Sequence, residues 1–290
     1  MKKATFYQKL INKKLMCSAC SHYCKLDIGK KGICGVRKNI GGVLYSLVYG
    51  LVAAIHLDPI EKKPLYHFMP GSEILSFGTV GCNFRCDFCQ NWDMSQVSKI
   101  PHRDLFGVEY NPAQIVDFAL ELGAPSVAYT YNEPGVFIEY AIDTMKIAHK
   151  KGLKNVFVSN GYLSKESRMK LTGLLDAVNI DLKSFDDGFY QKVCGARLQP
   201  VLDCIEDLYL KRVHLELTTL VIPGYNDSPT ELEKIASYIA NLDQNIPWHI
   251  SRFFPSYKMR DVVMTPLKTL KLAEKIGKKQ GLKNIYVGNI

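Results

Sequence analysis

Three closely spaced cysteines are the residues of this sequence with the clearest chemical potential. Cys82, Cys86 and Cys89 are separated by three and then two residues in the run Gly81-Cys-Asn-Phe-Arg-Cys-Asp-Phe-Cys-Gln90. Four-iron, four-sulfur clusters are held by cysteine thiolates, normally four of them. A local run that stops at three thiolates leaves one iron open to another ligand, so the spacing predicts a cluster that can act as a catalyst.

A zinc knuckle or three unrelated structural cysteines are the simpler interpretations of the same run. Zinc sites usually combine two closely spaced cysteine pairs, or cysteines with histidines. A single triplet with three and then two intervening residues fits that arrangement poorly, so we favour the iron–sulfur interpretation.

A second group of cysteines lies near the N-terminus. Cys17, Cys20, Cys24 and Cys34 are separated by two, three and nine residues. Four thiolates in so short a stretch predict a closed site for structural zinc or for a second iron–sulfur cluster, and the sequence does not separate the two. Four unpaired structural cysteines are the alternative.

The size and charge of the chain limit its class. Its 290 residues suffice for one large α/β barrel-type domain, alone or with a small appendage. No apolar run approaches the roughly 18 residues of a membrane span, and the first residues lack the apolar core of a signal peptide. We therefore expect a cytoplasmic protein without a membrane partner.

The net charge of +9 comes from scattered basic residues, which favours a lysine-rich surface over a nucleic-acid site.

Strand and helix patterns alternate from about residue 107 onward, which predicts parallel βα units. We expect strands at residues 73–77, 126–130, 155–159, 177–182, 213–222, 248–253 and 284–287. We expect helices at residues 111–123, 134–151, 164–175, 229–242 and 266–280, with further helical segments up to about residue 210. Residues 1–70 have a different character and predict a small cysteine-rich metal-binding module, followed by the main domain at 71–290.

Polar residues stand where successive strands of this series are expected to end. They are Asn132 and Glu133, then Ser159 and Asn160, then Asp181 and Lys183. Active sites of α/β barrels lie at the carboxyl ends of the strands, and alternation directs Asp181 and Lys183 to one face. Helix capping by Asn132 and Glu133 and a strand-end salt bridge between Asp181 and Lys183 are the simpler interpretations.

The cysteine spacing, with the aromatic residue Phe88 directly before Cys89, resembles the cluster loop of radical S-adenosylmethionine (SAM) enzymes. In that family the amino and carboxylate groups of SAM chelate the open iron. One electron then splits the sulfonium into methionine and a 5′-deoxyadenosyl radical, which abstracts hydrogen from a substrate. The resemblance implies a partial (β/α)6 barrel, a [4Fe–4S] cluster at the three cysteines, and an electron donor such as flavodoxin or ferredoxin.

The same resemblance implies a set of SAM contacts. They are Phe88 in the cluster loop, Tyr131, Asn132 and Glu133 at the ammonium, Ser159 and Asn160 near the ribose, Asp181 and Lys183 near the methionine carboxylate, and Ile222 in a Val-Ile-Pro-Gly turn beside the adenine.

Further motifs narrow the resemblance. The N-terminal cysteines with Gly32-Ile-Cys-Gly-Val-Arg37, the run Asp58-Pro-Ile-Glu-Lys-Lys-Pro-Leu-Tyr-His-Phe68 and the final Tyr286-Val-Gly-Asn289 are similar to the pyruvate formate-lyase activating enzyme-like proteins of the AmmeMemoRadiSam system. Glycyl-radical activases typically carry an Asp-Gly-Pro-Gly-x-Arg segment upstream of the cluster loop. The corresponding stretch of this chain is Ser72-Glu-Ile-Leu-Ser-Phe-Gly-Thr79, which lacks that segment.

These patterns lead to one main hypothesis and two alternatives. The main hypothesis is an anaerobic radical SAM enzyme whose substrate the sequence does not identify, with a protein among the candidates. One alternative is a glycyl-radical enzyme activase of the pyruvate formate-lyase activating type. The other is a basic, zinc-containing protein that binds nucleic acid, for which a steep salt dependence of binding is expected.

Overall fold

The computed structural model describes residues 1–290 and is built around one eight-stranded sheet. In spatial order its strands are β16 (Ile285–Gly288), β15 (Trp248–Arg252), β14 (His214–Val221), β13 (Ala177–Asp181), β12 (Lys154–Ser159), β11 (Ser126–Tyr129), β9 (Glu73–Gly78) and β8 (Ala54–Pro59). Seven of them run parallel, and only β8 is antiparallel to its neighbour β9. The two edge strands do not pair with each other, so the sheet is open.

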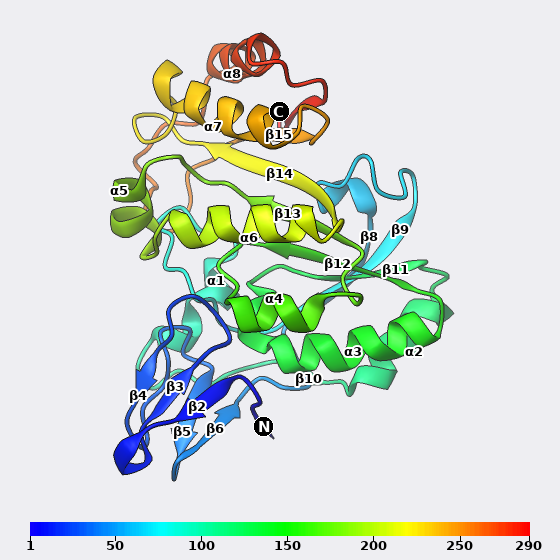
Figure 1. Cartoon of the computed structure of the whole chain (residues 1–290), viewed down its shortest axis with the longest axis vertical. Helices are drawn as coiled ribbons and strands as arrows, with labels where there is room; N and C mark the ends of the chain where they lie inside the picture. Colours follow the sequence, from blue (N-terminus) through cyan, green and yellow to red (C-terminus); the bar gives the residue numbers. More distant parts are fainter.

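Helices connect these strands and lie along the sheet (Figure 1). The longer ones are α2 (Pro112–Glu121), α3 (Ile138–Lys150), α4 (Lys165–Leu171), α6 (Gln199–Leu210), α7 (Pro229–Leu242) and α8 (Leu267–Lys279). Short helical turns are η1 (Ile11–Lys13), η2 (Ile60–Lys62), α1 (Trp92–Ser95), η3 (Val97–Lys99), η4 (Pro134–Phe137), α5 (Asp187–Phe189) and η5 (Tyr190–Cys194). None of the helices is both long enough and apolar enough to span a bilayer.

Local sequence signals explain where the helices begin. The Asn111 side chain accepts a hydrogen bond from the Gln114 backbone N–H at 3.0 Å, and the Gln114 side chain accepts one from the Asn111 N–H at 2.8 Å. This reciprocal capping box satisfies two backbone donors at the start of α2, and Pro112 fits the first helical position because its missing N–H would have no partner there. Ser164 and Ser228 cap α4 and α7 in the same general way.

The seven parallel strands confirm the predicted series of βα units. All four residues of β11 are buried, as expected for a central parallel strand covered on both faces. The predicted α/β fold with a parallel sheet and a cysteine-rich N-terminal region is therefore present. The sheet does not close, because the pairing ends at β16 and β8, and its curvature into a partial barrel stays a prediction.

The N-terminal region takes part in three small antiparallel sheets, one of which it shares with β10 from the segment after the cysteine loop. Their strands are β1 (Lys2–Lys3), β2 (Tyr7–Lys9), β3 (Leu15–Cys17), β4 (Lys25–Leu26), β5 (Arg37–Ile40), β6 (Val43–Ser46), β7 (Leu51–Val52) and β10 (Val108–Glu109). Gly41 and Gly42 join β5 to β6 with positive φ angles of 63° and 89°, which suits the tight two-residue turn of a hairpin. The domain boundary at residue 70 stays a prediction, and β8 already belongs to the large sheet.

A buried ion pair joins the N-terminal region to helix α3 of the main domain. Arg37 of β5 donates to both carboxylate oxygens of Glu139 in α3, with its Nη1 at 2.7 Å from Oε2 and its Nη2 at 2.6 Å from Oε1. The Thr5 backbone N–H donates to the same carboxylate at 2.9 Å. Burial opposes the charge of Glu139, but Arg37 outweighs it and lowers the pKa of this carboxyl. Each of these two buried charges therefore needs the other as its partner.

Replacing Glu139 with alanine is expected to lower the free energy of unfolding by about 3–5 kcal/mol, because the Arg37 charge stays buried without its partner. The matched control is Asp27→Asn, which breaks the half-exposed pair with Lys14 and should cost less than about 1 kcal/mol. Urea unfolding of both variants measures the difference. Equal decreases in the free energy of unfolding for the two variants would show that the buried pair does not stabilise the contact between the N-terminal region and α3.

Candidate active site

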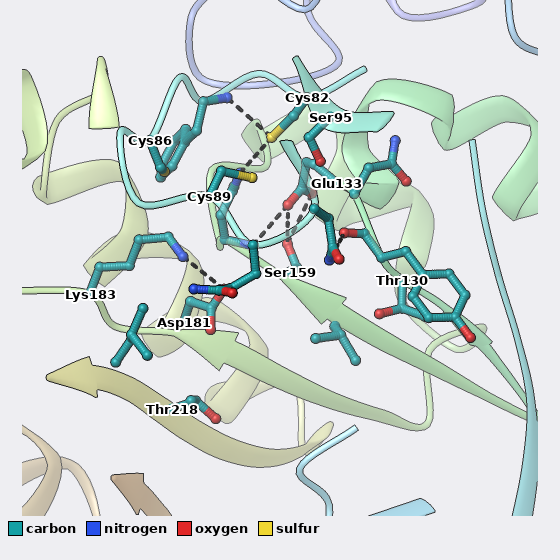
Figure 2. A pocket seen from close by; sticks show the side chains of 18 of the residues that line it. Cys82, Cys86, Cys89, Ser95, Thr130, Glu133, Ser159, Asp181, Lys183 and Thr218 are labelled. Atoms are coloured by element: carbon teal, nitrogen blue, oxygen red, sulfur yellow. Dashed lines mark hydrogen bonds and ion pairs between the residues drawn. The ribbon is translucent and has the colours of Figure 1, made fainter. Parts of the chain in front are cut away.

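A cavity of about 350 Å³ opens at the carboxyl ends of the parallel strands. This volume lies in the range of small-molecule sites. Figure 2 shows side chains from the loop after β9 facing side chains that follow β11, β12 and β13. All predicted site residues that follow these four strands line the cavity: Cys82, Cys86, Phe88, Cys89, Tyr131, Asn132, Glu133, Ser159, Asn160, Asp181 and Lys183.

The three cysteines lie on the loop after β9, with Cys86 buried and the other two half-buried. Burial raises the pKa of Cys82 and brings that of Cys89 to about 11. Two lysines oppose this effect: Lys99 acts on Cys82, and Lys183 acts on Cys86 and Cys89. The site therefore carries positive charge where thiolates would need it, since a metal binds the thiolate form.

A fourth cysteine lies against this triplet. Cys194 is fully buried at the end of η5, and its interaction with Cys86 is the largest cause that raises the pKa of the Cys86 thiol. A free cysteine such as Cys194 or Cys204 is by default a buried, inert thiol that packs as a small apolar group. No spacing pattern ties Cys194 to a triplet more than a hundred residues upstream, so only the fold reveals this contact.

Two asparagines hold the cysteine loop in place. The Asn132 side-chain amide donates to the Gly81 carbonyl oxygen at 2.6 Å. The Asn160 amide donates to Asn83 Oδ1 at 2.7 Å and lies 3.8 Å from the Cys82 sulfur. Both asparagines follow strands of the main sheet, so the sheet itself sets the position of the loop.

The Glu133 carboxylate is buried between two strand ends. Its Oε1 accepts from the Gly135 N–H at 2.9 Å, and its Oε2 accepts from the Asn160 N–H at 2.8 Å. The Ser159 hydroxyl bridges both oxygens at 3.0 and 3.1 Å. Burial raises the pKa of Glu133 to about 7 against the effect of these donors. The helix-cap interpretation left open by the sequence is thus realised, since Glu133 caps η4.

Tyr131 adopts a backbone conformation that is rare for its residue type. Its φ is 65°, a left-handed value that costs energy in a residue with a large side chain. Its hydroxyl donates to Asp58 Oδ2 at 3.0 Å, and the Asn91 amide donates to its carbonyl at 2.7 Å. The Lys63 ammonium, 2.6 Å from the same Asp58 oxygen, lies 5.0 Å from the centre of the Tyr131 ring. These contacts hold the side chain at the cavity wall.

Asp181 and Lys183 lie on one face, as alternation predicts, and form the strand-end ion pair that was the simpler interpretation, with Lys183 Nζ 2.8 Å from Asp181 Oδ2. Burial works against the charged ammonium, but Asp181 and the Cys86 thiol more than offset it, so the pKa of Lys183 is raised. The ammonium also lies 5.6 Å from the centre of the Phe88 ring. Lys183 therefore presents a permanent positive charge beside the cysteine loop.

Ile222 is the predicted contact that the structure does not bring to this cavity. It is fully buried, and its N–H donates to Asn226 Oδ1 at 2.6 Å within the turn after β14. Its role beside an adenine stays a prediction.

Several polar residues line the cavity without having been selected from the sequence. They are Lys62, Lys63, Gln90, Asn91, Ser95, Gln96, Thr218 and Ser251. Thr218 and Ser251 lie on expected strands, where the alternation of sides could have selected them. Lys62 and Lys63 stand at the end of η2, about twenty residues before the cysteine loop, and no local pattern predicts that they reach the cavity.

The N-terminal cysteines Cys17, Cys20, Cys24 and Cys34 do not line the cavity. All nine cysteines of the chain are free thiols. No three of its cysteine, histidine, aspartate and glutamate side chains stand where they could hold a single metal ion between them. Neither the N-terminal cysteines nor the triplet of Cys82, Cys86 and Cys89 is therefore arranged around a single metal ion.

A parallel sheet with a three-cysteine loop after its first parallel strand defines the general class: an α/β protein whose strand-end cavity is lined by thiols and charged side chains. The family model described as the Radical SAM superfamily matches residues 77–237. The chain therefore belongs to the radical SAM superfamily. Membership implies a [4Fe–4S] cluster and SAM as cofactors.

Individual relatives agree with this assignment. An uncharacterized protein of Methanocaldococcus jannaschii is 42% identical over 293 residues, which covers 100% of this chain and 86% of the relative. A putative glycyl-radical enzyme activating enzyme of the same organism is 26% identical, over 63% of this chain and 68% of the relative. A radical SAM methyltransferase from Sphaerobacter thermophilus aligns over 76% of this chain and 67% of its own with a TM-score of 0.58 at 14% identity, which supports the fold.

Proposed function

We propose that this chain cleaves SAM reductively and uses the product radical to abstract hydrogen from a substrate. The observation that carries the proposal is the convergence of three thiols, Lys183 and Glu133 on one cavity. A bound [4Fe–4S] cluster would supply one electron to SAM, which yields methionine and the 5′-deoxyadenosyl radical. We infer that the electron comes from a small redox protein such as flavodoxin or ferredoxin.

The residues around the triplet fit a cluster. Cys82, Cys86 and Cys89 supply three of the four thiolates that such a cluster normally takes. Asn83, between the first two cysteines, has a buried side-chain nitrogen without a hydrogen-bond partner. A buried donor without an acceptor is costly, and a cluster sulfur would supply that acceptor. Hydrogen bonds to the sulfurs are among the features that tune such clusters.

The charged residues fit SAM at opposite ends of its methionine part. Lys183 would pair with the carboxylate, because a charge-assisted hydrogen bond between an ammonium and a carboxylate is strong. Glu133 would contribute negative charge for the SAM ammonium, and the polar segment formed by Tyr131 and Asn132 would surround it. Ser159 and Asn160 would lie toward the ribose.

Anaerobically reconstituted protein is expected to release 5′-deoxyadenosine from SAM in the presence of dithionite. Cys86→Ala should reduce this release to background, because it removes one of three cluster thiolates. Cys204→Ala is the matched control: Cys204 is a buried cysteine of α6 outside the cavity, and its loss should leave the release near the parent level. Absence of 5′-deoxyadenosine from parent protein with a full cluster would contradict the proposed function.

Lys183→Met is expected to weaken the binding of SAM to the reconstituted protein about tenfold or more, since it deletes a charged hydrogen-bond donor from the cavity. Lys211→Met provides the control, because Lys211 pairs with Asp207 outside the cavity. Equilibrium binding without reductant measures both affinities. An unchanged Kd for the Lys183 variant would remove this residue from the SAM site.

The name of one relative favours a second candidate function. The Methanocaldococcus jannaschii relative at 26% identity is a putative glycyl-radical enzyme activating enzyme. For this chain, the corresponding activity would take the hydrogen atom from a glycine Cα of a partner protein and leave a glycyl radical there.

The source of the hydrogen atom separates the two functions. The reduced protein and SAM would be incubated with an anaerobic extract of the source cells grown on deuterated glycine. An activase is expected to move deuterium into 5′-deoxyadenosine. Unlabelled 5′-deoxyadenosine from the same extract would exclude glycine as the donor and leave the general radical SAM function in place.

A further inference from the structure

The four N-terminal cysteines gather around one turn of the small module. A backbone hydrogen bond of 2.9 Å from the Cys17 N–H to the Cys24 carbonyl brings these two residues together. A Cβ atom at Gly32 would lie 3.7 Å from the Cys24 sulfur and 3.8 Å from the Cys34 sulfur. The charge of each of the other three thiols acts on Cys20. The fold therefore converts the sequence spacing into a group of four neighbouring thiols.

Burial raises the pKa of Cys20, Cys24 and Cys34, and backbone N–H groups act against this effect at each of the three thiols. These N–H groups belong to His22 at Cys20, to Ile33 at Cys24 and to Val36 at Cys34, and each lowers the pKa of its thiol. Neutral thiols packed as small apolar groups need no such donors. In a buried metal–thiolate centre, N–H groups near the sulfurs partly offset the negative charge of the thiolates.

Arg37 adds a buried positive charge beside the group. It is 2% exposed, and apart from Glu139 the charged groups that act on it are led by Cys17 and Cys34. Its Nη atoms bind Glu139, but its Nε has no hydrogen-bond partner. The two buried side-chain nitrogens of the chain without a partner are Arg37 Nε and Asn83 Nδ2. Asn83 lies in the loop of the Cys82 triplet, and Arg37 lies near the N-terminal cysteines.

We propose that Cys17, Cys20, Cys24 and Cys34 bind a second [4Fe–4S] cluster, with Arg37 Nε–H as a hydrogen-bond donor to its sulfurs. Three close cysteines and one distant cysteine are typical of iron–sulfur sites, whereas structural zinc usually takes two close pairs. A tetrahedral zinc site also needs sulfurs about 3.8 Å apart, from its Zn–S bonds of about 2.3 Å. The N-terminal thiols are not arranged around a single ion, and neither is the triplet at Cys82. A cluster spreads its ligands over four irons, so its four sulfurs need not converge on one point.

This second centre would lie directly beside the catalytic loop. The His22 ring nitrogen Nε2 lies 2.9 Å from the Asn83 carbonyl oxygen, and the Ser98 hydroxyl donates to the Cys34 carbonyl at 2.8 Å. A Cβ atom at Gly81, the residue before Cys82, would lie only 2.9 Å from that same Cys34 carbonyl oxygen. Gly81 has a φ of 98°, so both its conformation and this close approach require glycine.

Iron and acid-labile sulfide contents test the proposal independently of activity. After anaerobic reconstitution with ferrous iron and sulfide, the parent protein is expected to hold about eight of each per chain. A Cys82→Ala, Cys86→Ala, Cys89→Ala variant should retain about four of each, with the spectrum of a reducible four-iron cluster. This variant leaves the N-terminal module untouched, so the result does not depend on whether the module tolerates mutation.

A Cys20→Ser, Cys24→Ser variant should also hold about four irons and four sulfides, and Cys204→Ala should hold about eight. Loss of all iron from the triple variant would overturn the proposal. So would about one zinc per chain retained in that variant when zinc competes with iron during reconstitution. Neither result bears on 5′-deoxyadenosine formation, so this proposal and the proposed function fail separately.

Discussion

The buried carboxylate of Glu133 holds the candidate active site together. It receives hydrogen bonds from the N–H groups of Gly135 and Asn160 and from the Ser159 hydroxyl, so it joins the ends of β11 and β12. Asn160, fixed by this bond, reaches Asn83 in the cysteine loop. The cost of burying the charge appears in the raised pKa of Glu133. Loop, strand ends and cavity wall are thus positioned by one satisfied anion rather than by apolar packing alone.

Charge balance is the second constraint on this architecture. The chain collects buried or half-buried thiols in two places, and each collection has cationic side chains nearby: Lys99 and Lys183 at the triplet, and Arg37 at the N-terminal group. Lys99 lies between the two groups of thiols in its electrostatics, because the charges of Cys34 and Cys82 both act to raise its pKa. Buried cations need partners as much as buried anions do. Asp181 is the partner of Lys183, and Glu139 is the partner of Arg37.

The segment between β8 and β9 closes the other end of the sheet and also contributes to the cavity. Its backbone is held by the Asn179 amide, which donates to the Pro64 carbonyl at 2.8 Å, and by the fully buried Glu216, which accepts from the N–H groups of Tyr66 and His67. This anchoring brings Lys63 to Asp58 and into the cavity lining. A positively charged residue that precedes the cysteine loop thus becomes part of the same site.

The order of strands and helices could be predicted from the sequence because hydrophobic periodicity and capping residues act over a few neighbouring positions. The triplet at Cys82, the polar residues after the strands and the facing of Asp181 and Lys183 followed from the same local rules. Contacts between distant segments did not. Cys194 against Cys86, Lys63 beside Tyr131, and the free Arg37 Nε near the N-terminal thiols depend on register and loop path. Those are set by the packing of the whole chain, so no local pattern encodes them.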